Sequence, residues 1–193
     1  MKRIVLLFGF ILALALCASA QTYIDFHDMA FTKAPSPMPD AYPASFHLSW
    51  DNFYYVTPGL WKEAGPGFWV DPATYHNTVA FIGGKMCPFA VTCAGAIKIG
   101  PSIGMTPVAK DFTPVSMTLS AGWASNTVTV LGYNNGKFVG SLVWKLTTTP
   151  ITKTFPNTWR VSELVFTPGV PATGPAVFPK SGSVVIYSFI LVR

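Results

Sequence analysis

A stretch rich in Pro and Gly, "TPGLWKEAGPGFWVDPATYHN" (57–77), gathers side chains that could bind a ligand. These candidate residues are Trp61, Trp69, Asp71, Tyr75 and His76. Flat aromatic faces pack against the C–H-bearing faces of sugar rings, while polar neighbours bind sugar hydroxyls. Because loops run over protein surfaces, this composition favours a glycan-binding loop. The alternative is a loop that folds over a sheet and caps the core.

A second aromatic stretch, "LSWDNFYYV" (48–56), precedes that loop. Phe46, Leu48 and Trp50 recur with the period of two that places side chains on one face of a strand, so we expect them in the core. The Asp–Asn pair that follows should end the strand. One of the next two tyrosines must then point outward, which makes Tyr55 a further candidate for stacking on a ligand.

Three carboxylates lie where a structural calcium ion could be held. Asp25 and Asp28 belong to "YIDFHD", and Asp111 begins a predicted strand. Sandwich domains hold calcium through carboxylate and backbone oxygens. The alternative for each of these aspartates is a solvated strand end. No other cofactor is expected.

Catalytic machinery is sparse. A glycosidase needs two carboxylates across a cleft, and the only glutamates are Glu63 and Glu163. A pair such as Glu63 and Asp71 is conceivable, but no pattern marks it. The G-x-S-x-G pattern of a nucleophilic serine occurs as "GPSIG" (100–104), but no helical period follows it, as the strand–turn–helix context of that motif requires. The sequence therefore favours a non-catalytic protein and leaves a hydrolase or lyase as the weaker alternative.

The first twenty residues predict export. Lys2 and Arg3 precede the apolar run "IVLLFGFILALAL", and "ASA" ending at Ala20 is a small-residue cleavage site. The run is too short to span a bilayer as a membrane anchor. We expect a signal peptide at 1–20 and a mature domain at 21–193 that is secreted to the extracellular space.

Two cysteines remain in the expected mature chain, Cys87 and Cys93, within "CPFAVTC". An oxidising compartment favours a disulfide that closes this small loop. A two-thiol metal site is the alternative, and it would need further ligands from isolated histidines.

The expected mature chain has the composition of a globular β-protein. The full chain is 50% hydrophobic and only 11% charged, which is the opposite of a disordered chain. Loss of Lys2 and Arg3 lowers the formal net charge from +5 to +3, and no Lys/Arg run is present, which argues against nucleic-acid binding.

Strand signals dominate this composition, and no segment has a helical period with caps. The predicted strands are 22–27, 45–50, 78–82, 95–99, a strand through 115–119, a hairpin whose second strand is 137–147, 160–166 and 183–192. The hairpin turns at "NNG", which suits positive φ, and the last strand should be covered on both faces. We expect one all-β, two-sheet antiparallel sandwich of jelly-roll type, with a closed barrel as the alternative.

The order of these segments resembles that of secreted fungal and microbial jelly-roll domains, which are similar to carbohydrate-binding modules and largely of unknown function. The resemblance rests on an early "F-D-x-L"-like strand, a Trp followed by Asn, a "F-x-x-x-S-x-x-L-x-x-A-W" strand, a "V-T-V-x-G-Y-x-N-G" hairpin and a late "V-x-x-L-x-F" strand. These fall on Trp50, Asn52, Phe112, Ser116, Leu119, Trp123, Val128 to Gly136, Val161, Leu164 and Phe166. The chain ends in "FILVR" where such domains often carry an Asp–Asn pair.

Composition and resemblance together lead to one functional expectation. We expect a monomeric, extracellular, non-catalytic module that binds a polysaccharide, a cell-surface glycan or a wall component, with no membrane anchor in the mature chain. The alternative is an effector or structural protein that recognises a protein partner through the same aromatic loop.

Overall fold

A computed structural model describes residues 21–32, 35–57, 78–82, 94–100, 110–122, 125–169 and 184–193. These residues form strands and connections, with no helix among them. The strands are β1 (Gln21–Ile24), β2 (Ser36–Pro37), β3 (Leu48–Asp51), β4 (Phe53–Val56), β5 (Val79–Ile82), β6 (Gly95–Ile99), β7 (Thr113–Ala121), β8 (Asn126–Asn134), β9 (Lys137–Leu146), β10 (Ile151–Thr154), β11 (Glu163–Pro168) and β12 (Val184–Val192).

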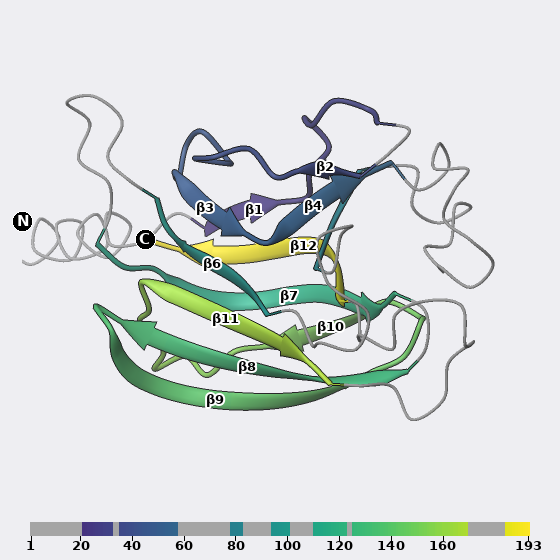
Figure 1. Cartoon of the computed structure of the whole chain (residues 1–193). Coiled ribbons are helices and arrows are strands. Elements are labelled where there is room, and N and C mark those ends of the chain that lie inside the picture. The colour runs from purple at the N-terminus through teal and green to yellow at the C-terminus, as the bar shows by residue number, and fades with distance from the viewer. Residues whose placement is uncertain are drawn as a thin grey trace, which may run out of the picture.

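The strands form two antiparallel sheets that face one another. The seven-stranded sheet has the order β10-β7-β12-β5-β4-β2, with β1 also paired to β12, and the five-stranded sheet has the order β3-β6-β11-β8-β9 (Figure 1). Between β5 and β8, and again from β9 to β12, each successive strand lies in the other sheet. Such crossing connections are those of a jelly roll. The predicted all-β sandwich of jelly-roll type is confirmed.

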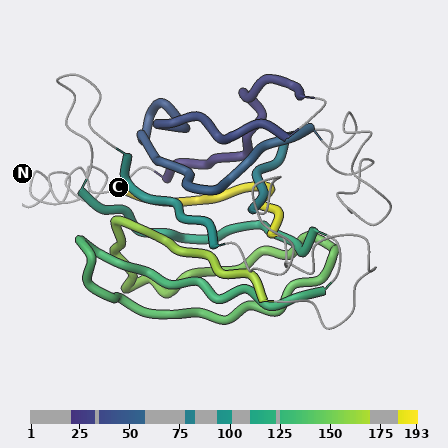
Figure 2. The backbone as a smooth tube through the Cα atoms, viewed as in Figure 1, coloured from purple at the N-terminus to yellow at the C-terminus, as the bar shows by residue number. Residues whose placement is uncertain are grey.

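One large core lies between the sheets and draws on both of them. Six of its phenylalanines are at most 1% exposed: Phe26, Phe46, Phe53, Phe112, Phe166 and Phe189. Their rings meet edge to face at centroid distances near 6 Å, for example Phe46 against Phe112 at 6.2 Å and Phe112 against Phe189 at 6.1 Å. This arrangement suits the charge distribution of aromatic rings. Figure 2 shows the backbone of the two facing sheets as a tube.

The stretch around β3 and β4 turns a corner between the sheets. Phe46, Leu48 and Trp50 are buried, as predicted. Asn52 then takes a positive φ of 57°, a conformation that Asn tolerates better than most residues. The chain continues as β4 in the opposite sheet, where Phe53 meets Trp50 edge to face at 5.4 Å.

Other predicted elements fall close to their expected positions. β12 lies inside the seven-stranded sheet and is buried along most of its length, as expected for a strand covered on both faces. The turn between β8 and β9 has positive φ at Asn135 (49°) and Gly136 (76°), which confirms the predicted hairpin turn. Three strands were not predicted: β4, β10 and the two-residue β2, which interrupts a Pro-rich segment that the sequence indicates as a loop.

Candidate binding surface

Most of the predicted ligand-binding residues lie outside the described residues. This holds for Trp61, Trp69, Asp71, Tyr75 and His76, and likewise for the predicted disulfide partners Cys87 and Cys93. Their predicted roles therefore stay predictions.

Tyr55 is the one predicted ligand-binding residue that the structure describes. It lies on β4, half-buried, with its side chain packed against the core between the sheets. Its neighbour Tyr54 packs on the other face of the seven-stranded sheet, against a separate buried cluster that includes Val56 and Phe81. Alternation along β4 therefore turns Tyr54 rather than Tyr55 to the outer face.

The predicted calcium ligands fall in two places. Asp25 forms a hydrogen-bonded ion pair with His27, and Asp28 Oδ1 accepts a hydrogen bond from the Tyr42 hydroxyl at 2.5 Å. The Asp25 carboxylate raises the pKa of His27 chiefly through that hydrogen bond. Burial, together with Asp28, raises the pKa of Tyr42 far above its usual value.

Asp111 is paired elsewhere, with Arg160. In the part of the chain that the structure describes, no three His, Cys, Asp or Glu side chains gather in a way that could hold a metal ion. Calcium binding therefore stays a prediction.

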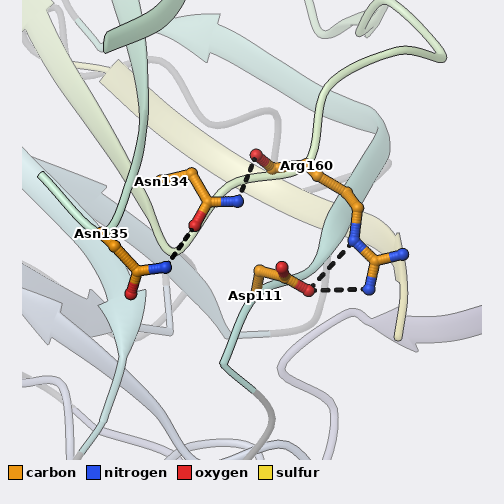
Figure 3. A network of polar contacts seen from close by, with 4 residues as sticks. All are labelled: Asp111, Asn134, Asn135 and Arg160. Carbon is orange, nitrogen blue, oxygen red and sulfur yellow. Dashed lines mark hydrogen bonds and ion pairs between the residues drawn. The ribbon is translucent and has the colours of Figure 1, made fainter. Parts of the chain in front are cut away.

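Asp111 and Arg160 belong to a polar network at the β8–β9 turn (Figure 3). Arg160 donates to Asp111 Oδ1 from Nη2 at 2.8 Å and from Nε at 3.1 Å, and this contact lowers the pKa of Asp111. Asn134 Nδ2 donates to the Arg160 carbonyl at 3.2 Å, and Asn135 Nδ2 donates to Asn134 Oδ1 at 2.8 Å. The hairpin turn is thereby tied to the segment that leads into β11.

The same turn brings two aromatic rings to the outer face of the five-stranded sheet. Gly132 lies opposite Gly140, yet the next pair is Tyr133 with Phe138, so β9 carries Val139 as an extra residue. This β-bulge reverses the alternation of β9 and points Phe138 outward beside Tyr133. The ring centroids are 5.9 Å apart at an interplanar angle of 65°, and Phe138 is 61% exposed.

Polar side chains continue the row that these rings begin. Tyr133 lies opposite Glu163 on β11, Glu163 opposite Lys98 on β6, and Lys98 opposite Ser49 on β3. Lys98 forms an ion pair with Asp51, whose hydrogen bond raises the pKa of Lys98. We call the residues Asp51, Lys98, Tyr133, Phe138 and Glu163 the outer row.

The outer row combines an exposed ring with the Lys98–Asp51 ion pair and the Glu163 carboxylate. The outer row was not predicted from the sequence, although two signals were present. Alternation along β8 turns Tyr133 to the face of the sheet that is opposite to the face of the core residues Val128 and Val130. The "NNG" turn fixes the hairpin, but no sequence pattern predicts the bulge at Val139. This bulge brings Phe138 to the outer face.

Nothing helical in the described part of the chain has the length and apolar character that a membrane crossing requires.

Comparison with known proteins supports the fold. No protein-family model and no curated protein matches this chain. Among solved structures, a DUF4465 family protein from Bacteroides caccae is similar, with a TM-score of 0.59 and 9% identity over 90% of this chain and 99% of that chain. The family 32 carbohydrate-binding module of C. perfringens NanJ, in complex with galactose, has a TM-score of 0.36 and 14% identity over 59% of this chain and 77% of that chain. The second value is too low to carry an argument. The first, at so low an identity, establishes a shared fold.

Proposed function

We propose that this protein is a secreted, non-catalytic β-sandwich module that binds a glycan through the outer row. The observation that carries the proposal is the exposed Phe138 ring beside Tyr133, at one end of a row of hydrogen-bonding side chains. Secretion remains part of the proposal and rests on the signal-like residues 1–20.

The chemistry of the outer row suits a polyhydroxylated ligand. The ring of Phe138 offers an apolar face to the C–H groups of a sugar, while the Glu163 and Asp51 carboxylates accept hydrogen bonds from hydroxyls and Lys98 donates them. The two rings are not coplanar, so the outer row suits one stacked sugar with neighbours that reach toward the polar side chains.

The side chains around the outer row are restrained before any ligand binds, which also favours this surface as a binding site. The Lys98–Asp51 and Arg160–Asp111 ion pairs, with the Asn134–Asn135 hydrogen bond, restrain side chains around the row. A restrained surface loses less conformational entropy when it binds a ligand.

The decisive experiment is retention of the mature protein on insoluble polysaccharides (chitin, cellulose and β-glucan), comparing the parent with Phe138→Ala. The matched control is Phe31→Ala, because Phe31 is 70% exposed but lies outside the outer row. Retention of the parent and of the control, with clearly weaker retention of Phe138→Ala, supports the proposal. Equal retention of all three proteins contradicts a site at Phe138.

A Trp61→Ala/Trp69→Ala variant of confirmed fold tests the predicted aromatic loop in the same assay. Loss of retention in this variant alone would place the glycan site in 57–77 and not on the outer row. No retention of any protein would exclude binding of these polymers.

Protein binding is the second candidate, and exposed apolar side chains on β9 favour it. Val143 is 66% exposed and Val139 37%, on a strand that forms the edge of its sheet. Such an edge can pair with a strand of another protein. The two candidates are separated by pretreating extracellular material that retains the protein. Periodate, which oxidises vicinal diols of sugars, removes a glycan ligand, whereas protease removes a protein partner.

A further inference from the structure

An ordered array of hydroxyl side chains lies on the opposite surface of the sandwich, on the outer face of the seven-stranded sheet. Thr118 on β7 lies opposite Thr152 on β10 and opposite Ser188 on β12. Two residues earlier on β7, Ser116 lies opposite Thr154. Ser188 is buried, so the accessible hydroxyls are those of Ser116, Thr118, Thr152 and Thr154, which we call the hydroxyl array.

Alternation along β7 fixes the direction in which the hydroxyl array points. Met117 and Leu119, which flank Thr118, belong to the core between the sheets. Thr118 and Ser116 therefore face away from the core. On the same face Ser116 is opposite Ile190, and Ile190 is opposite Tyr23 of β1, whose side chain is 61% exposed. An exposed aromatic ring thus borders the hydroxyl array.

Sheet geometry gives the hydroxyl array a regular spacing. Neighbouring strands lie about 4.8 Å apart, and residues two apart on one strand are separated by roughly 6.7 Å. The Thr118 and Thr152 hydroxyls are hydrogen-bonded at 2.9 Å. Each hydroxyl can donate one hydrogen bond and accept two, so even this bonded pair keeps capacity for a ligand.

The chemistry of the hydroxyl array restricts what it could bind. It contains no carboxylate for a cation and no Lys or Arg for a phosphate or a nucleic acid. Lys153, between Thr152 and Thr154, lies opposite the core residue Met117 and so belongs to the other face. A protein interface would centre on large aromatic or Arg side chains, which the middle of the array lacks. An uncharged, hydroxyl-rich ligand is the one that matches its neutrality and its donors and acceptors.

We propose that the hydroxyl array, bordered by Tyr23, is a second contact site for an uncharged polysaccharide chain. The inference rests on the proposed glycan-binding function and extends it. The outer row and the hydroxyl array lie on opposite outer faces of the sandwich, so one molecule can hold two chains at once. The protein then bridges polysaccharide chains in addition to binding them.

The test is a Thr118→Val/Thr152→Val/Thr154→Val variant of the mature protein. Valine keeps the β-branched shape of threonine and suits a strand, so the hydroxyls are removed with little change in shape. Thr118→Ser/Thr152→Ser/Thr154→Ser is the matched control, because it keeps all three hydroxyls. Far-UV circular dichroism and size-exclusion chromatography establish that each variant is folded and not aggregated.

Each variant is measured with and without Phe138→Ala, by depletion onto insoluble β-glucan and by turbidity with a soluble neutral β-glucan. In the Phe138→Ala background we expect residual retention that the valine variant weakens about tenfold or more, because three hydroxyl hydrogen bonds are lost. We expect the parent and the serine control to raise turbidity, and both the valine variant and Phe138→Ala to lose this bridging.

The outcomes separate the two proposals. If Phe138→Ala abolishes retention while the valine variant behaves as the parent does in both assays, the hydroxyl array is not a site and the proposed function stands. If the parent binds neither glucan, the proposed function and the second site are both contradicted for this polymer.

Discussion

Arg160 directs two hydrogen bonds to a single carboxylate oxygen of Asp111, from Nη2 at 2.8 Å and from Nε at 3.1 Å. Its own carbonyl accepts a third hydrogen bond, from Asn134 at the β8–β9 turn. The ion pair is therefore the outer end of a chain of contacts that reaches the hairpin carrying Tyr133 and Phe138. A change at Asp111 should therefore affect the end of the outer row that Tyr133 and Phe138 form.

We predict that Asp111→Asn lowers the thermal stability by a small amount near neutral pH and by less in acid. Arg160 lowers the pKa of Asp111 in the folded protein, so the ionised carboxylate favours folding above the unfolded-state pKa of about 3.9. This contribution is lost as pH falls below that value through the folded-state pKa. The effect is small because the pair is solvent-exposed.

Differential scanning calorimetry at pH 7 and at pH 3 checks this prediction, with Asp40→Asn as the control for loss of an exposed carboxylate. The difference in melting temperature between parent and Asp111→Asn should be larger at pH 7. A difference that is the same at both pH values would contradict the assigned role of the ion pair.

His27 should titrate above its ordinary pKa of about 6.5, because the Asp25 carboxylate stabilises the imidazolium. The stabilising contribution of this contact is complete below that value and is lost as pH rises through the folded-state pKa. The pH dependence of the His27 ring proton shifts in NMR spectra measures the pKa directly. Asp25→Asn should lower it, and an unchanged His27 pKa in that variant would show that the contact does not persist in solution.

The close approach of Trp159 to two glycines predicts a strict size limit within the hairpin. A Cβ atom added at Gly132 would lie 2.9 Å from Cζ3 of Trp159, and one added at Gly140 would lie 2.9 Å from Cζ2. Gly132→Ala should therefore lower the free energy of unfolding by about 1–3 kcal/mol, the usual cost of overpacking a core. Urea denaturation measures this change.

The control for this prediction is a double-mutant cycle with Trp159→Leu, which removes the ring that the new methyl group meets. In the Trp159→Leu background, Gly132→Ala should cost clearly less than in the parent. Additive effects of the two substitutions would show that the alanine acts through something other than the ring.

The sequence predicted those parts of the fold that follow from strict alternation or from a demanding turn. Val128 and Val130 alternate toward the core, and Asn135 and Gly136 adopt the positive φ that their turn requires. β4 was missed because the corner at Asn52 moves the chain into the other sheet after a single residue. Local composition does not reveal such a change of sheet.

The candidate site was less predictable, because a departure from alternation creates it. Counting by two from Leu142 would place Phe138 on the core-facing side of β9. The extra residue Val139 reverses this and sets Phe138 beside Tyr133. The partners of Lys98 and Arg160 are distant in sequence, since Asp51 and Asp111 come from other parts of the chain. Such pairs are fixed by strand order, which a single sequence does not display.

Electrostatics at the outer row lead to a final prediction about ligand charge. In the folded protein Lys98 is paired with Asp51, so its ammonium group is partly neutralised toward an anionic ligand. Asp51→Asn removes that partner and should increase retention on a sulfated polysaccharide resin at low ionic strength. The gain should fade in roughly 1 M salt, where the screening length falls to about 3 Å.

Asp40→Asn changes the net charge equally at a site outside the outer row and is the matched control. A gain confined to Asp51→Asn locates the effect at Lys98, whereas an equal gain in both variants would assign it to the overall charge of the protein.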